Sequence, residues 1–222
     1  MDETPTVPAV TAPRGGAAGL GTARRPSDPA LDEPALTFDA ELLLAARGPG
    51  AGIGAAIFDV DGVLTDGRLY IGEHGEVFKA FSTLDGHGLK LLVQAGIVPI
   101  VVTGRDSPAV RRRVAELGLP HAAYGVADKL PVATALLGQV GLGWDRVAVM
   151  GDDWPDRPLM QRAAFACAPA NAHIEVKAVA HYVTSAVGGH GAAREFCDLL
   201  LVASGRYADL LRGPLPTLDG AN

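Results

Sequence analysis

Polar residues follow the apolar segments from which a buried sheet could be built. Asp59 and Asp61 come directly after AAIF, Thr103 lies near the end of IVPIVVTG, and Asp152 lies near the end of RVAVMGDD. In open α/β sheets, ligands bind beyond the carboxyl ends of the strands. We therefore expect these side chains to share one pocket, together with Lys129, which stands between the second and third segments.

These residue types suit phosphoryl transfer with a divalent cation. Residues i and i+2 of a strand share a face, about 6–7 Å apart, so Asp59 and Asp61 would converge with Asp152 and raise one another's pKa unless a cation were present. Oxygen ligands without His or Cys favour Mg²⁺. A hydroxyl, glycine amides and a lysine at the same rim suit a phosphoryl group. One Asp could be the nucleophile, and a second carboxylate could transfer the proton of the leaving group.

The elements that must position these residues alternate along the chain. Apolar segments predict strands over 55–60, 97–104, 121–125, 146–153, 165–170 and 181–184. Periodic segments predict helices over 84–96, 107–118, 128–141 and 156–163, and one long closing helix over 191–213. Because the strands are almost entirely apolar, we predict an α/β fold of the Rossmann-like, doubly wound type, with a parallel sheet covered on both faces. Residues 68–81 predict a β-hairpin inserted after the first strand.

Composition divides the chain and excludes some partners. Residues 1–35 have few large apolar side chains and are expected to be a disordered tail, 36–50 a short helix and linker, 51–213 the folded domain, and 214–222 a flexible C-terminal tail. A net charge of -6 argues against a broad nucleic-acid surface. No signal peptide or membrane-spanning segment is recognisable, and Cys167 and Cys197 lie in apolar contexts that favour buried thiols in a reducing compartment. We expect a cytoplasmic protein that binds neither nucleic acid nor membranes.

Four segments, in this order and spacing, resemble the motifs of the haloacid dehalogenase superfamily of phosphatases. They are FDVDGVLTDG (58–67), VVTG (101–104), Lys129 and GDDWPD (151–156). The resemblance implies that Asp59 is the nucleophile and that Asp61 is the general acid/base and also binds metal through its backbone carbonyl. It further implies that Thr103 and Lys129 hold the transferring phosphoryl group, that Asp152 ligates Mg²⁺ with Asp59, and that Asp153 and Asp156 support Asp152 or orient Lys129.

Longer segments resemble one family within that superfamily, the 3-deoxy-D-manno-octulosonate 8-phosphate phosphatases. These are FSTLDGHGLKLL (81–92), TGRDSPAVRRRVAELGL (103–119), APANAHIEVKAVAHYVT (168–184) and GGHGAAREFCDLLL (188–201). The family often has Arg where this chain has Leu84. The resemblance implies a sugar-phosphate substrate, the lipopolysaccharide inner-core sugar pathway and a homotetramer. The candidate substrate-binding residues are Thr65, His87, Thr103, Gly104, Arg105, Lys129 and Arg194.

The spacing of the motifs leaves no room for a cap domain. The gap from Asp61 to Thr103 holds only the hairpin and one helix, and the gap from Thr103 to Lys129 only a helix and a short strand. The pocket of a single chain should therefore be open, so either the substrate is a macromolecule or oligomerisation closes the site. The hairpin strands expose apolar and aromatic edges unless they pair with another subunit, and we favour the oligomer.

Several alternatives remain open from the residues alone. An acyl-neuraminate 9-phosphate is the nearest other substrate. A receiver-like phospho-signalling module or an inactive scaffold would keep a similar sheet and some of the same residues. Arg105 could make a surface ion pair, Asp153 and Asp156 could be helix caps, and Arg194 could be a surface arginine. His87 could line the rim, and His190 could reach a neighbouring site.

Overall fold

The structure is a computed structural model that describes residues 34–213. The expected tails over 1–35 and 214–222 lie outside this range, apart from residues 34 and 35. Within it, a six-stranded parallel sheet has the order β5-β4-β1-β6-β7-β8. The strands are β1 (Ala55–Phe58), β4 (Val98–Val102), β5 (Ala122–Ala123), β6 (Val147–Met150), β7 (Phe165–Ala168) and β8 (Tyr182–Val183). The predicted doubly wound α/β fold is confirmed.

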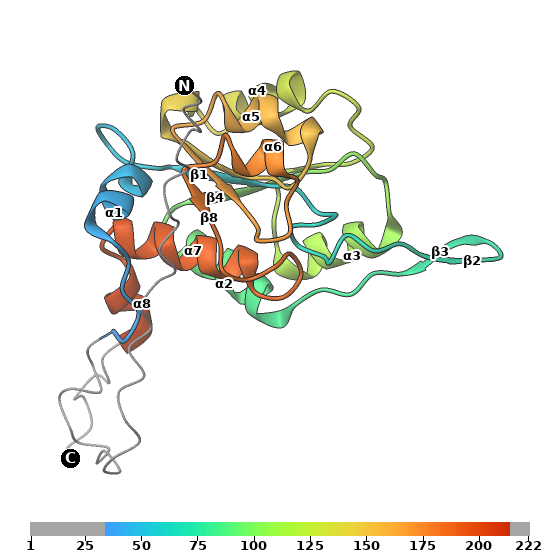
Figure 1. The fold of residues 1–222 in the computed structure, drawn as a ribbon, viewed down its shortest axis with the longest axis horizontal. Coiled ribbons are helices and arrows are strands. Elements are labelled where there is room, and N and C mark those ends of the chain that lie inside the picture. Colours follow the sequence, from blue (N-terminus) through green and yellow to red (C-terminus); the bar gives the residue numbers. More distant parts are fainter. Residues whose placement is uncertain (1–33, 214–222) are drawn as a thin grey trace, which may run out of the picture.

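Helices cover both faces of this sheet (Figure 1). Because side chains alternate along a strand, Ala56 and Phe58 face one core while Ala55 and Ile57 face the other. On the first face lie α1 (Ala40–Arg47), α2 (Thr83–Gln94), α3 (Pro108–Leu117) and α7 (Ala192–Ala203). On the second lie α4 (Lys129–Gln139), α5 (Arg157–Met160) and α6 (Ile174–Lys177). Cys167 and Cys197 are buried free thiols, as predicted.

The hairpin of β2 (Tyr70–Gly72) and β3 (Gly75–Phe78) extends away from the body of the domain (Figure 1). The segment between β1 and β4 holds only this hairpin and α2, and the segment between β4 and α4 holds only α3 and β5. No cap domain therefore occurs within the described residues. Nor does any helix of residues 34–213 have the length and apolarity that crossing a bilayer requires.

Three of the predicted elements differ from the structure. The closing helix predicted over 191–213 is two helices, because the chain turns at Gly205 (φ +72°) before α8 (Tyr207–Arg212). The strands predicted over 55–60 and 146–153 end at Phe58 and Met150, so their acidic residues lie in the following loops. The sequence also did not predict α6 or the short 3₁₀ helices Trp144–Arg146 and Trp154–Asp156.

Candidate active site

Three neighbouring strands bring the polar residues to one cleft. β1 lies between β4 and β6, and the N–H of Asp59 donates to the carbonyl of Met150 at 3.1 Å, so the loops after these strands start at the same level. The cleft at this edge has a volume of about 500 Å³. The candidates that it brings together are Asp59, Asp61, Thr103, Gly104, Arg105, Lys129, Asp152, Asp153 and Asp156.

A buried ammonium group joins two of the carboxylates. Lys129, the first residue of α4, places its Nζ 2.7 Å from Asp59 Oδ1 and 2.7 Å from Asp156 Oδ1. Burial alone would lower the pKa of Lys129, but Asp59 and Asp156 outweigh that effect and raise it. Asp156 Oδ2 accepts the backbone N–H groups of Asp152 and Asp153, at 3.1 and 3.4 Å. Asp156 therefore holds the lysine with one oxygen and the loop after β6 with the other.

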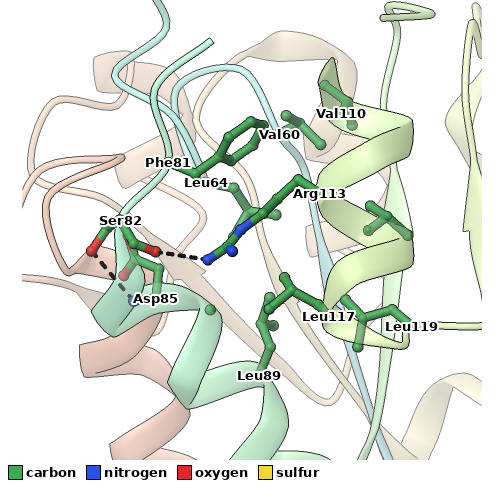
Figure 2. A pocket seen from close by; sticks show the side chains of 12 residues that line it. Val60, Leu64, Phe81, Ser82, Asp85, Leu89, Val110, Arg113, Leu117 and Leu119 are labelled. Carbon is green, nitrogen blue, oxygen red and sulfur yellow. Dashed lines mark hydrogen bonds between the residues drawn. The ribbon is translucent and has the colours of Figure 1, made fainter. Parts of the chain in front are cut away.

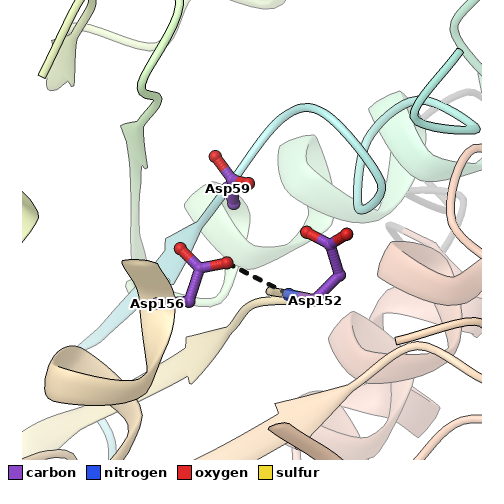
Figure 3. A group of neighbouring side chains, drawn as sticks. All are labelled: Asp59, Asp152 and Asp156. Carbon is purple, nitrogen blue, oxygen red and sulfur yellow. Dashed lines mark hydrogen bonds between the residues drawn. The ribbon is translucent and has the colours of Figure 1, made fainter. Parts of the chain in front are cut away.

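The cleft contains more negative than positive charge. Asp59, Asp152 and Asp156 each have an oxygen within 4.8 Å of the others (Figure 3), and one lysine ammonium balances only one of the three charges. Burial, followed by the charge of Asp156, raises the pKa of Asp59 to about 7. Burial, followed by the charge of Asp59, raises the pKa of Asp152 to about 8. The cluster therefore disfavours its own ionisation unless a cation is added.

A divalent cation fits this cluster. Asp152 Oδ1 is buried and has no hydrogen-bond partner among residues 34–213, which is costly unless another group satisfies it. The donors are oxygens only, the type that Mg²⁺ prefers. Since both oxygens of Asp156 are already engaged, Asp59 and Asp152 are the carboxylates best placed to hold the ion.

Glycine is required where the loop after β1 passes Asp152. Gly62 has a φ of +95°, and a Cβ atom there would lie 2.0 Å from Asp152 Oδ2. The loop of GGHG packs against the same segment, because a Cβ atom on Gly188 would lie 1.7 Å from the carbonyl oxygen of Gly62. These close approaches hold the loop after β1 beside the acidic cluster. They explain why glycine stands at Gly62 and at Gly188 of the GGHG segment.

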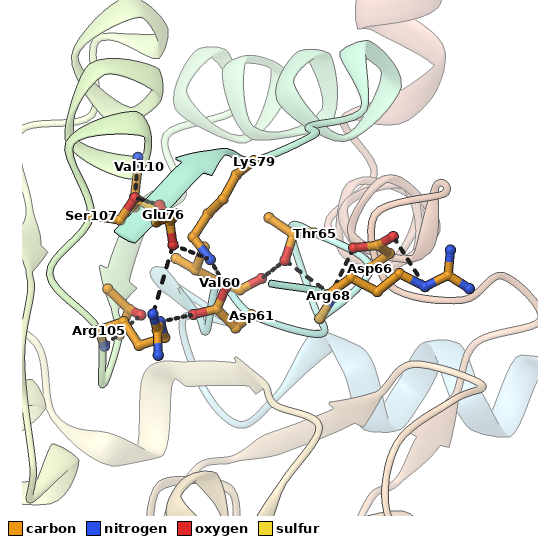
Figure 4. Close-up of polar contacts among 12 residues, drawn as sticks. Val60, Asp61, Thr65, Asp66, Arg68, Glu76, Lys79, Arg105, Ser107 and Val110 are labelled. Atoms are coloured by element: carbon orange, nitrogen blue, oxygen red, sulfur yellow. Dashed lines mark hydrogen bonds and ion pairs between the residues drawn. The ribbon is translucent and has the colours of Figure 1, made fainter. Parts of the chain in front are cut away.

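Asp61 lies in the cleft wall, but its carboxylate does not join the acidic cluster as the strand argument predicted. The expected i, i+2 geometry is wrong because β1 ends at Phe58 and the chain turns after Asp59. Instead, Lys79 at the base of the hairpin donates to Asp61 Oδ1, and Arg105 Nε lies 3.8 Å from Asp61 Oδ2 (Figure 4).

Sequence reasoning missed Lys79 and its partner Glu76. Lys79 Nζ lies 3.2 Å from Glu76 Oε2, and Ser107 donates its hydroxyl to Glu76 Oε1. Burial would raise the pKa of Glu76, but the hydrogen bonds of Ser107 and Lys79 and the charge of Arg105 together lower it. The available signal was the pair of charged residues in GEVFKAF, an otherwise apolar hairpin strand.

The remaining candidates near the cleft have different surroundings. Thr103 is buried, and its Oγ1 accepts the N–H of Arg105 at 3.4 Å. Thr65 is also buried, but its hydroxyl donates to the carbonyl of Val60 at 3.3 Å and accepts the N–H of Gly67 at 3.3 Å. Thr65 thus fixes the loop after β1 and is not among the residues that line the cleft. Its role as a substrate contact stays a prediction.

His87 and Arg194 do not reach the cleft either. Together with residues of α8 they line a separate pocket of about 190 Å³. Arg194 Nε donates to Asp198 Oδ1 at 2.8 Å, a pair along α7. Within one chain, α2 and α7 thus place both residues at a different pocket from the cleft. Their role in substrate binding stays a prediction.

A third pocket lies between α2 and α3 (Figure 2). Its walls are mainly apolar, and Arg113 Nη2 donates to the carbonyl of Ser82 at 3.3 Å across it. The free space is about 10 Å³, which is room for about one water. This pocket is too small for a sugar phosphate.

The chain is similar to known hydrolases. Residues 121–196 match the family model of haloacid dehalogenase-like hydrolases. The 3-deoxy-D-manno-octulosonate 8-phosphate phosphatase of Escherichia coli strain K12 is 42% identical over 150 residues, which cover 68% of this chain and 80% of that protein.

Solved structures of related enzymes extend the similarity. The Moraxella catarrhalis phosphatase of the same name, in complex with a magnesium ion, a phosphate ion and a KDO molecule, is 36% identical with a TM-score of 0.73, covering 78% of this chain and 97% of that one. The cobalt-bound form of the Haemophilus influenzae phosphatase is 39% identical with a TM-score of 0.69, covering 74% and 93%.

Proposed function

Because the chain belongs to the 3-deoxy-D-manno-octulosonate 8-phosphate phosphatase family of the haloacid dehalogenase superfamily, we propose that its substrate is that eight-carbon sugar-acid phosphate. The chain is a sugar-phosphate phosphatase, and Mg²⁺ is its cofactor. The observation that carries the proposal is the cluster of Asp59, Lys129, Asp156 and the unpartnered oxygen of Asp152 at the ends of adjacent parallel strands. An inactive scaffold would have no need to bury such an unbalanced cluster.

The residues account for both halves of the hydrolysis. One oxygen of Asp59 attacks phosphorus, and its bond to phosphorus forms as the bond from phosphorus to the sugar oxygen breaks. Asp61 gives a proton to the departing sugar oxygen. A water molecule then attacks the phosphorus of the aspartyl-phosphate and returns a proton to Asp61, releasing inorganic phosphate and restoring Asp59.

The other residues position the group that is transferred. Lys129 would donate to a phosphoryl oxygen from its buried place beside Asp59, and Thr103 would offer its hydroxyl from the neighbouring loop. Asp59, Asp152 and the backbone carbonyl of Asp61 would hold Mg²⁺, which supplies positive charge to balance the phosphoryl oxygens and the carboxylates. Asp156 would keep Lys129 in place, and Asp153 caps the 3₁₀ helix that carries Asp156.

One position departs from the family and bears on substrate identity. Leu84, where the family often has Arg, is 59% exposed at the start of α2, and it offers no positive charge to a substrate. With this departure from the family, an acyl-neuraminate 9-phosphate is the alternative substrate.

We further propose that the protein acts as a homotetramer in the cytoplasm, in the lipopolysaccharide inner-core pathway. The hairpin exposes 61% of Ile71, 66% of Val77 and 51% of Phe78. An isolated two-stranded hairpin with such an edge is marginal in water, and pairing with other copies would cover it. A second copy would also supply a wall for the open cleft.

Phosphate release from a panel of sugar phosphates, with Mg²⁺ and with EDTA, tests the substrate. The account predicts metal-dependent release that favours the eight-carbon acid. Preference for the nine-carbon acid would support the alternative and direct attention to Leu84. No release from any sugar phosphate would refute the proposed function.

A further inference from the structure

Lys79 is the most buried member of a charged network at the edge of the cleft, although it does not itself line the cleft. Its side chain is 1% exposed, although it follows the hairpin strand β3 directly. Its ammonium group contacts Asp61 and Glu76, and Glu76 in turn accepts from Ser107, the N-cap of α3 (Figure 4). The network therefore joins the hairpin to the loop after β1 and the loop after β4.

The contacts of Asp61 show what the lysine contributes. Oδ1 of Asp61 pairs with Lys79, whereas the basic group within 4 Å of Oδ2 among residues 34–213 is the more exposed Arg105, at 3.8 Å. A carboxylate held by one oxygen keeps its rotamer and leaves the other oxygen available. Without Lys79, the carboxylates of Asp61 and Glu76 would share only Arg105, at 3.8 and 3.9 Å.

We infer that Lys79, assisted by Glu76, is a positioning residue that fixes the carboxylate of Asp61 for proton transfer to the leaving sugar oxygen. Lys79 does not line the cleft, so it touches no substrate and acts through Asp61. The inference rests on the proposed function, because it assigns Asp61 the proton transfer. It also gives the hairpin a part in the chemistry, since movement of its base would move Asp61.

The leaving group separates this role from a structural one. A sugar alkoxide departs with difficulty and needs a proton, whereas the nitrophenolate of p-nitrophenyl phosphate departs without one. General acid catalysis contributes about 10²–10⁴-fold where it is needed. Since kcat/KM reports the steps up to the first irreversible one, it isolates phosphoryl transfer to Asp59 from hydrolysis of the aspartyl-phosphate.

The experiment compares the kcat/KM of Lys79→Met with that of wild type, with Mg²⁺ present. The two substrates are the eight-carbon sugar-acid phosphate and p-nitrophenyl phosphate. We expect kcat/KM to fall at least about 10-fold for the sugar phosphate and less than about 3-fold for p-nitrophenyl phosphate. Lys90→Met removes an exposed lysine of α2 and is the matched control, with both values unchanged. Glu76→Gln, which keeps Lys79, should show the same selectivity with a smaller effect, and serves if Lys79→Met does not fold.

A double-mutant cycle tests whether Lys79 acts through Asp61. In an Asp61→Asn background, Lys79→Met should cause no further loss with the sugar phosphate. Equal losses on both substrates, an additive loss in that background, or unchanged kcat/KM would overturn the inference. Wild type that hydrolyses neither substrate would instead refute the proposed function.

Discussion

Replacing Asp152 by Asn should make the metal-free protein more stable. The pKa of this carboxyl is raised from 3.8 to about 8, mainly by burial and by the charge of Asp59. Below pH 3.8 the carboxyl is protonated in both the folded and the unfolded chain, so its raised pKa does not affect stability. Above pH 3.8 the unfolded chain loses this proton more readily than the folded chain, so the free energy of unfolding falls until the pH reaches about 8. Asn has the same shape and no charge, so it removes this cost.

The size of the effect follows from the same shift. Each pH unit between the unfolded and folded pKa values lowers the free energy of unfolding by about 1.4 kcal/mol. Because the side chain of Asp152 is partly exposed, solvent screening reduces the summed loss of stability to about 2 kcal/mol at pH 7.5. For a domain of this size, that corresponds to a rise in Tm of about 4–8 °C in EDTA. At pH 4 the variant and wild type should unfold at nearly the same temperature.

Magnesium should reverse the order of stability. The ion stabilises the folded state in proportion to its affinity, and the amide of the Asp152→Asn variant offers it no charge, so Mg²⁺ should raise the Tm of wild type much more than that of the variant. Asp209→Asn, at a side chain that is 74% exposed, is the control and should change neither value. Thermal unfolding in EDTA and in Mg²⁺ measures the Tm of wild type and of both variants. A variant less stable than wild type in EDTA at pH 7.5, or equally stabilised by Mg²⁺, would refute the reasoning.

Three further predictions follow from the site and the hairpin. Lys129→Ala leaves Asp59 and Asp156 without their shared cation, so urea unfolding should show a stability lower by about 3 kcal/mol. Competition assays should show weaker inhibition by inorganic phosphate, and unchanged inhibition would argue against phosphoryl binding by Lys129. Because protons and Mg²⁺ compete for Asp59, whose pKa is about 7 in the metal-free protein, Mg²⁺ affinity measured by calorimetry should fall as the pH drops from 8 to about 6, and a pH-independent affinity would contradict the assignment. Val77→Glu should dissociate the assembly in light scattering, since it places a charge on the exposed hairpin face; an unchanged mass would remove the hairpin from the interface.

The fold was largely predictable because strong local signals determine it. The buried strands are short apolar runs such as AAIF and VAVM, and glycines or capping residues such as Ser107 and Gly118 mark the ends of α3. The break at Gly205 was missed because apolar spacing continues through it, and a single glycine within a periodic segment does not show whether the chain turns.

The candidate site was predictable where residues follow adjacent strands. Asp59, Thr103 and Asp152 meet because β4, β1 and β6 are neighbours. Sequence could not show that Lys79 reaches Asp61, since this contact depends on how the hairpin leaves the domain. It also could not show that α2 and α7 direct His87 and Arg194 to another pocket, because neither position follows from the strand order.

The central claim is that Asp59 carries the phosphoryl group during turnover. The most direct test is to mix the protein with the eight-carbon sugar-acid phosphate and Mg²⁺, quench within milliseconds in acid, and locate phosphate on the digested chain by mass spectrometry. The account predicts transient phosphorylation of Asp59 that EDTA abolishes and that Asp59→Asn lacks, with no phosphate released by that variant. Phosphate release by Asp59→Asn at the wild-type rate, or phosphate found on a different residue, would contradict it.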